Sequence, residues 1–203
     1  IEREAELELD LRRAVRNDEL RLHLQPVIDL TSGDMTGAEA LVRWQHPTRG
    51  MIAPGEFIPL AEKSALIFEL ERWVLAEACD RLAAWRTRDP ETTMQMAVNI
   101  SGRHLIEGDL LADVRAALER SGADATMLEL ELTETHLLDN LDRATSVLDA
   151  LREMGITIAV DDFGTGYSSM SYLRNLPIDT LKIDRSFVAR ATEHGYDSTV
   201  IEA

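Results

Sequence analysis

Short apolar or alternating runs recur along the chain, and longer stretches in which apolar residues return every three or four positions separate them. The short runs predict β-strands, because strand side chains either alternate between two faces or are buried on both. One run, around Ile158 and Val160, ends at two consecutive aspartates followed by a glycine-rich turn. The predicted strands cover residues 20–28, 35–44, 93–101, 127–132, 156–161 and 179–183.

The longer stretches have the period of amphipathic helices. Pro59 is expected to bend or interrupt the second of these helices, and Gly155 is expected to cap the fifth. Further helices are expected after Ser168 and from about Ser186. The other predicted helices cover residues 4–19, 54–64, 67–86, 105–120 and 140–154.

Alternating strands and helices predict repeated βα units and a largely parallel sheet. The first two strands are separated by Ser32-Gly33-Asp34, which is typical of a hairpin turn, so the first strand should run antiparallel to the others. Polar residues recur at the carboxyl ends of the strands. That recurrence favours a (β/α) barrel over an open sheet, because the strand ends of a barrel converge on one face.

Five successive predicted strands deliver a carboxylate, an amide or an amine at or near their ends. These residues are Glu39, Asn99, Glu131, the pair Asp161 and Asp162, and Lys182. Convergent carboxylates repel one another unless cations compensate them. Oxygen ligands of this kind suit Mg²⁺ or Mn²⁺, and two such ions can activate water against a phosphodiester. Lys182 could then balance phosphate charge or hold the attacking water.

Each of these residues also has an ordinary structural interpretation. A single glutamate at a strand end is commonly a solvated carboxylate, Asn99 a turn residue and Lys182 a partner in a surface salt bridge. Their recurrence over successive strands favours a site. A receiver domain would also combine two acidic residues with a lysine, but it would place the acidic pair at its first strand, whereas Asp161 and Asp162 come late.

Composition narrows the possible functions. The net charge of −16 disfavours a surface that binds polymeric nucleic acid through its phosphates. No apolar run reaches the roughly 18 residues of a membrane helix, so we expect no membrane insertion and a cytoplasmic domain. The single cysteine, Cys79, lies in a helical apolar pattern and is interpreted as a buried thiol. The five histidines lack metal-ligand spacing and are interpreted as structural or exposed.

Seven segments in order resemble the EAL domain family of cyclic di-GMP phosphodiesterases, named for Glu39-Ala40-Leu41. The resemblance covers residues 19–203, and residues 1–18 are expected to form a connector helix like those that follow diguanylate cyclase domains. The segments are QPV at 25–27, AEALVRW at 38–44, FIPLAE at 57–62, VNIS at 98–101, ELTE at 131–134, DDFGTGYSS at 161–169 and LPIDTLKIDRSFV at 176–188.

The resemblance implies a TIM-like barrel with an antiparallel first strand, and Mg²⁺- or Mn²⁺-dependent hydrolysis of cyclic di-GMP to the linear dinucleotide. Lys182 would orient the nucleophilic water, and Glu134 would brace the 162–170 loop, which couples the metal site to a homodimer surface. The implied substrate contacts are Gln25, Leu41 and Arg43, with Arg43 on a phosphate. The implied ligands of two ions are Glu39, Asn99, Glu131, Asp161 and Asp162.

The family barrel has two further strands that this chain does not contain. We expect either that the chain belongs to a longer protein, which is the favoured interpretation, or that another chain completes the barrel. Three functions stay open: a phosphodiesterase, a non-catalytic cyclic di-GMP receptor, and a protein-interaction scaffold. The intact EAL and DDFGTG segments favour the first, and an upstream sensory or cyclase domain is a reasonable expectation for the parent protein.

Overall fold

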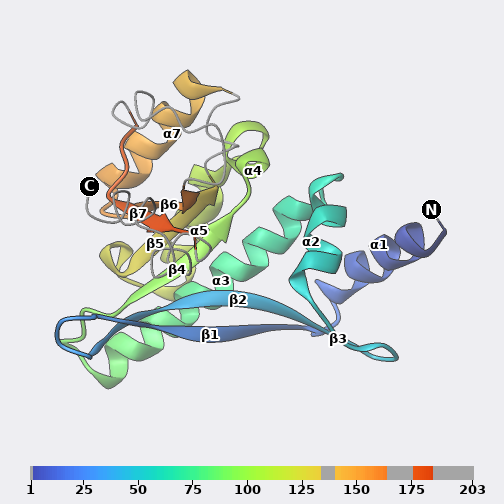
Figure 1. Cartoon of the computed structure of the whole chain (residues 1–203), viewed down its shortest axis with the longest axis horizontal. Coiled ribbons are helices and arrows are strands. Elements are labelled where there is room, and N and C mark those ends of the chain that lie inside the picture. Colours follow the sequence, from blue (N-terminus) through green and yellow to red (C-terminus); the bar gives the residue numbers. More distant parts are fainter. Residues whose placement is uncertain (1, 134–139, 164–175, 185–203) are drawn as a thin grey trace, which may run out of the picture.

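The computed structural model of the chain describes residues 2–133, 140–163 and 176–184 (Figure 1). Its strands form one sheet, and all six predicted strands are present within a few residues of their expected bounds. A short additional strand, β3, follows the second of them and was not predicted. The strands are β1 (Leu20–Ile28), β2 (Met35–His46), β3 (Gly50–Ile52), β4 (Gln95–Ile100), β5 (Leu128–Thr133), β6 (Thr157–Phe163) and β7 (Thr180–Ile183).

The strand order is β1-β2-β4-β5-β6-β7, with β3 paired to β2. β1 runs antiparallel to β2, as predicted from the hairpin, and β2, β4, β5, β6 and β7 are parallel to their neighbours along the path. Within the described residues the sheet is not closed, since β1 and β7 lie at the two ends of this order. The carboxyl ends of the parallel strands share one edge. Glu39 lies near the carboxyl end of the part of β2 that pairs with β4, and Asn99, Glu131 and Lys182 lie near the ends of their own strands.

Helices flank this sheet, and their bounds correct several predictions. Within the described part of the chain, no helix is long and apolar enough to cross a bilayer. The helices expected after Ser168 and near Ser186 lie outside the described residues. The observed helices are α1 (Glu2–Ala14), α2 (Pro54–Glu62), α3 (Leu66–Arg88), α4 (Gly102–Glu107), α5 (Leu110–Ser121), the short 3₁₀ helix η1 (Ala125–Met127) and α7 (Leu141–Glu153).

Two helix predictions were wrong in their bounds, and one of the two effects expected of Pro59 does not occur. The helix predicted over residues 4–19 ends at Ala14, and Asp18 after it has a positive φ of 52°. The helix predicted over residues 105–120 is two helices, because Gly108 ends α4 and the side chain of Asp109 accepts a hydrogen bond from Ala112 N–H to begin α5. Pro59 does not interrupt α2, which continues through it to Glu62.

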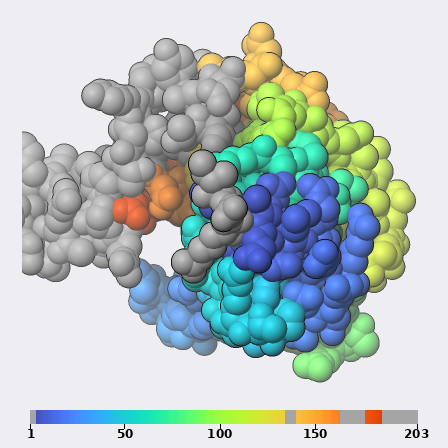
Figure 2. All heavy atoms as spheres, turned by 90° about the vertical axis from the view of Figure 1, so that its right-hand side faces the viewer, coloured from blue at the N-terminus to red at the C-terminus, as the bar shows by residue number. Residues whose placement is uncertain are grey.

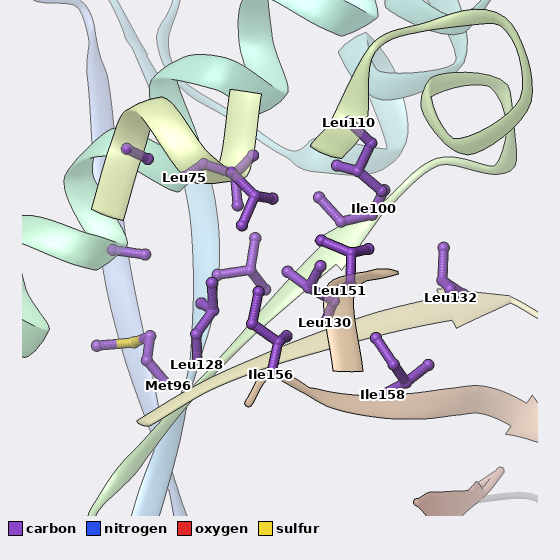
Figure 3. Close-up of a cluster of buried hydrophobic side chains, with 14 of the residues drawn as sticks. Leu75, Met96, Ile100, Leu110, Leu128, Leu130, Leu132, Leu151, Ile156 and Ile158 are labelled. Carbon is purple, nitrogen blue, oxygen red and sulfur yellow. The ribbon is translucent and has the colours of Figure 1, made fainter. Parts of the chain in front are cut away.

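The main hydrophobic core lies between the parallel strands and helices α3, α5 and α7 (Figure 3). Leu130 and Ile158 come from neighbouring strands, and Leu75, Leu110 and Leu151 reach them from the helices. All five are at most 2% exposed. Burial of each such side chain contributes about 1.5–3 kcal/mol, so this core holds the strand ends in a fixed arrangement.

A second core joins α1 to the far end of β2 and to α2. Leu11, Trp44, Phe57 and Leu66 are each fully buried there, and the rings of Trp44 and Phe57 meet edge to face with centroids 5.8 Å apart. Figure 2 shows α1, in dark blue, lying against the cyan and teal surface of β3 and α2. The N-terminal helix therefore packs on the same folded body as the sheet.

Candidate active site

The site begins with the register of three neighbouring parallel strands. Glu39 lies near the middle of β2, and Asn99 of β4 is directly opposite Glu131 of β5. The Nδ2 atom of Asn99 donates a hydrogen bond of 2.8 Å to Oε1 of Glu39. Two of the predicted ligands are thus in direct contact, and the amide oxygen of Asn99 remains available for another partner.

Lys182 brings the remaining strand into this group. Its Nζ donates a hydrogen bond to Oε1 of Glu131 and lies 3.6 Å from Oε2 of Glu39 and 4.0 Å from Oδ1 of Asp161. Burial alone would lower the pKa of Lys182, but the hydrogen bond to Glu131 and the three carboxylate charges outweigh it and raise that pKa. Lys182 is therefore a charged ammonium that compensates carboxylates from three other strands.

Glu131 is the deepest carboxylate of the site. It is 2% exposed, and its Oε2 atom is buried without a hydrogen-bond partner among the described residues. Burial raises the pKa of Glu131 to about 7, although the hydrogen bond and charge of Lys182 act in the opposite direction. A buried acceptor without a donor is costly, so this oxygen is suited to an additional cationic or donor ligand.

Asp161 and Asp162 occupy an irregular end of β6. The pairing of β6 with β7 shifts register between Val160 and Phe163, and Asp162 has a positive φ of 54°, which is uncommon outside glycine. Burial, together with the charges of Asp161 and Asp184, raises the pKa of Asp162. This bulge separates the two neighbouring carboxylates: Asp161 comes within 4.0 Å of Lys182, whereas Asp162 is exposed.

The donor set fits a hard divalent cation. Glu39, Asn99, Glu131 and Asp161 all supply oxygen atoms, which Mg²⁺ and Mn²⁺ prefer, and the unpartnered oxygen of Glu131 lies among them. Within the described residues, however, no three acidic, histidine or cysteine side chains converge closely enough to hold an ion as they stand. Lys182 lies between these carboxylates in the present arrangement, so their charges are already partly compensated.

A largely apolar pocket of about 380 Å³ adjoins the carboxylates. Asn99 belongs to its lining, and Leu41 and Arg43, two of the predicted substrate contacts, line it from β2. Its opposite wall is formed by α2, including Pro54 and Ile58, which sequence reasoning did not identify. The combination of an apolar lining, one arginine and an adjacent group of carboxylates is typical of a site for a ligand with apolar and anionic parts.

Two of the predicted site residues are not placed at the pocket or the carboxylate group by the described structure. Gln25 is exposed on β1, where it pairs in register with Glu39, but it is outside the set of described residues that line the pocket. Glu134, together with most of the 162–170 loop, lies outside the described residues.

The structure also reveals a buried polar cluster that the sequence analysis missed. Glu71 lines the pocket from α3 and contacts the fully buried His104, which in turn contacts Asp113. All five histidines, His104 among them, were interpreted as structural or exposed. The sequence does contain a signal for this cluster. Glu71 lies on the apolar face of α3, one turn from Ile67 and one turn from Leu75, where a buried charge needs a partner.

Comparison with known proteins identifies the family. The EAL domain family model matches residues 8–203. The chain is 44% identical over 200 residues to the cyclic di-GMP phosphodiesterase NbdA of Pseudomonas aeruginosa. The matched region covers 98% of this chain and 25% of NbdA. It is 41% identical over 194 residues to the bifunctional diguanylate cyclase/cyclic di-GMP phosphodiesterase MucR of the same organism, covering 96% and 28%. The chain thus spans about a quarter of the length of these relatives.

Solved structures agree with this assignment. The PaMucR phosphodiesterase in complex with c-di-GMP superposes with a TM-score of 0.89 at 41% identity, covering 97% of this chain and 79% of that one. The FimX EAL domain of Pseudomonas aeruginosa bound to c-di-GMP gives 0.83 at 25% identity, covering 95% and 76%. These neighbours confirm the TIM-like α/β barrel architecture, although the barrel is not closed within the described residues. The antiparallel first strand is shown by the pairing of β1 with β2. The chain belongs to the EAL domain family.

Proposed function

We propose that this chain is a phosphodiesterase domain that hydrolyses cyclic di-GMP to linear pGpG with the help of Mg²⁺ or Mn²⁺. The observation that carries the proposal is the convergence of Glu39, Glu131 and Asp161 around Lys182, beside a pocket that contains Arg43. Asn99 joins this group through its hydrogen bond to Glu39. The relatives whose names include this activity support the choice of substrate.

The proposed metal ligands are Glu39, Asn99, Glu131, Asp161 and Asp162. When bound, two ions would neutralise phosphate charge and lower the pKa of a water molecule, so that hydroxide is available near neutral pH. The raised pKa of Glu131 is consistent with this role, because a bound cation favours the ionised form of a carboxyl group that burial disfavours.

The chain's own residues would orient the reaction. Arg43 would bind a phosphate of the dinucleotide, and the apolar surfaces of Leu41, Pro54 and Ile58 would hold a purine base. Lys182 would hold the attacking water by a hydrogen bond, which its charged ammonium can donate while Glu131 and Glu39 fix its position. Gln25 would contact the substrate from β1.

Further parts of the proposal concern the parent protein. Since the chain spans about a quarter of NbdA and MucR, we propose that it works beside a sensory or cyclase domain and that its substrate, a second messenger, is met in the cytoplasm. We also propose a homodimer through the 162–170 loop, braced by Glu134.

Hydrolysis by the full-length protein tests the proposal. Purified protein is incubated with cyclic di-GMP and Mg²⁺ or Mn²⁺, and pGpG is followed by chromatography. Glu39→Gln and Glu131→Gln should each lower the rate by at least about 100-fold, while Glu153→Gln on the outer face of α7 should not change it. Binding of the nucleotide without turnover would favour the non-catalytic receptor, and neither binding nor turnover would favour the scaffold.

A further inference from the structure

The buried cluster beside the pocket contains a carboxylate with two specific partners. Glu71 of α3 is 6% exposed. Its Oε1 accepts a hydrogen bond of 2.7 Å from the backbone N–H of Ser101, and its Oε2 lies 2.7 Å from Nδ1 of His104. Both oxygens of Glu71 are therefore engaged by the segment that leaves β4.

His104 is fully buried between two acidic side chains. Its Nδ1 faces Glu71, and its Nε2 lies 2.9 Å from Oδ2 of Asp113. Two carboxylate acceptors need an N–H on each ring nitrogen, which only the imidazolium form provides. Arg72 approaches the same Asp113 oxygen to 3.4 Å, so the charges alternate through the cluster and compensate one another.

The surroundings of His104 leave it little room to move. The Ser101 side chain accepts a hydrogen bond from the backbone N–H of His104 and so caps α4. A side chain at Gly108 would place its Cβ 2.4 Å from the imidazole Cδ2, a separation that no packing can accept. The ring of Phe68 lies 5.4 Å from the imidazole at a tilted angle. The imidazolium is thus a rigid support for Glu71.

This support acts on the strand end that carries a proposed metal ligand. Asn99 and Ser101 are two positions apart, both line the pocket, and Glu71 lines it as well. The backbone N–H of Ser101 is fixed by Glu71, while the Asn99 amide is fixed by Glu39. The short segment from Asn99 to Ser101 is therefore held at both ends, at the side chain of Asn99 by Glu39 and at the backbone of Ser101 by Glu71.

We propose that Glu71, held in place by His104, is a positioning residue that fixes the β4–α4 turn and thereby aims the amide oxygen of Asn99 into the carboxylate site. The inference rests on the proposed function. Partners that orient a metal ligand typically change metal affinity or activity by about 10–100-fold when they are removed.

Glu71→Ala and Glu71→Gln in the full-length protein test this role. Glu71→Ala should weaken Mn²⁺ binding, measured by calorimetry without nucleotide, by about 10-fold and should lower kcat by about 10–100-fold, with KM changed less than kcat. Glu71→Gln can still accept the Ser101 N–H and should recover most of both losses. Hydrogen exchange of the Ser101 amide should be faster in Glu71→Ala than in Glu71→Gln.

Glu69→Gln is the matched control, because this carboxylate on the same helix lies 3.7 Å from Arg16 and outside the pocket lining. A purely structural role would lower the melting temperature of Glu71→Ala while leaving Mn²⁺ affinity and kcat at the wild-type level, and this result would overturn the inference. If Glu71→Ala does not fold, Glu71→Gln and His104→Gln provide the test. Wild-type Mn²⁺ affinity and kcat in both variants would overturn the positioning role. A loss of Mn²⁺ affinity and kcat in His104→Gln alone would support it.

The wild-type protein separates this inference from the proposed function. An active wild type with unchanged Glu71 variants refutes only the positioning role. A wild type that neither binds Mn²⁺ nor cleaves cyclic di-GMP refutes the proposed function, and the positioning role falls with it because Asn99 then has no ion to meet.

Discussion

The side-chain amide of Asn99 on β4 donates a 2.8 Å hydrogen bond to the carboxylate of Glu39 on the neighbouring parallel strand β2. This contact fixes which end of the amide faces Glu39. The nitrogen is occupied by the carboxylate, and the oxygen is left as a possible ligand for a cation. An asparagine suits this position better than an aspartate, because a second carboxylate would be repelled by Glu39.

Replacement of Asn99 by leucine should lower the affinity for Mn²⁺ while leaving the stability of the fold nearly unchanged. Asn99→Leu keeps the side-chain size but removes both the donor to Glu39 and the oxygen ligand. Asn99 is exposed, so we expect the free energy of unfolding to change by less than about 1 kcal/mol. Mn²⁺ affinity, measured by calorimetry, should fall by about 10-fold or more. Unchanged affinity would remove Asn99 from the ligand set.

Replacement of Lys182 by methionine should leave three carboxylates without their cation. Lys182 contacts Glu131, Glu39 and Asp161. We expect the metal-free protein to lose about 2 kcal/mol, less than the roughly 3–5 kcal/mol for a fully buried pair, because Lys182 is 30% exposed and Glu131 can take up a proton. Chemical denaturation measures this difference.

Mn²⁺ distinguishes this explanation from a simple packing defect. If charge repulsion causes the loss, Mn²⁺ should stabilise Lys182→Met more than the wild type, since the ion replaces the missing positive charge. Activity should remain at least about 100-fold lower, because the proposed hydrogen bond from Lys182 to the attacking water is absent. Equal stabilisation of both proteins by Mn²⁺ would argue against repulsion among the carboxylates.

The stability conferred by His104 should depend on pH in a definite direction. Burial lowers the pKa of His104, but the hydrogen bonds and charges of Glu71 and Asp113 outweigh burial and raise it above the ordinary value of 6.5. Arg72 is the other charged group at this cluster. Because the folded protein holds the proton more tightly, the contribution is complete below pH 6.5 and is lost as the pH rises through the folded-state pKa.

Urea unfolding of the wild type and His104→Gln from about pH 6 to about pH 9 measures this contribution. The difference in unfolding free energy should be largest at the acidic end and should shrink as the pH rises. His23→Gln, at an exposed position of β1, is the control for replacing a histidine outside this cluster. A difference that grows with pH would show that His104 is neutral in the folded protein.

The sequence alone predicted the strand ends well, because their signals are local. Glu39, Asn99 and Lys182 each sit in a short run of strand-forming residues, and parallel strands bring their carboxyl ends to one edge. The antiparallel first strand followed from the turn around Gly33, which has a φ of 79°. Neither conclusion required knowledge of distant contacts.

The parts that sequence reasoning missed depend on contacts between distant segments. The role of Glu71 requires α3 to pack beside the β4–α4 turn, and the pocket wall at Pro54 and Ile58 requires α2 to face β2. The break at Gly108 was hidden because apolar residues on both sides keep a helical period. The bulge at Asp162 was also unpredictable, since two adjacent aspartates do not reveal which one adopts a positive φ.

Gly37 allows the close approach of β2 and β4 on which the Glu39–Asn99 contact depends. A Cβ atom at this position would lie 2.4 Å from the backbone oxygen of Gln95, its partner in the β2–β4 register. Since the obstacle is backbone, no side-chain rotation can relieve it, and Gly37→Ala must push the two strands apart. We expect a loss of about 1–3 kcal/mol in unfolding free energy and weaker Mn²⁺ binding, because Glu39 moves away from Asn99.

Gly55→Ala is the same chemical change as Gly37→Ala, but it should stabilise the protein instead of destabilising it. Gly55 lies at the start of α2 with no atom within 4 Å of an added Cβ, so alanine should stabilise the protein by up to about 1 kcal/mol through its helix propensity. Denaturant melts and Mn²⁺ titrations of both variants measure the contrast. If Gly37→Ala matches the wild type in stability and Mn²⁺ affinity, then the spacing of β2 and β4 does not control the distance between Glu39 and Asn99.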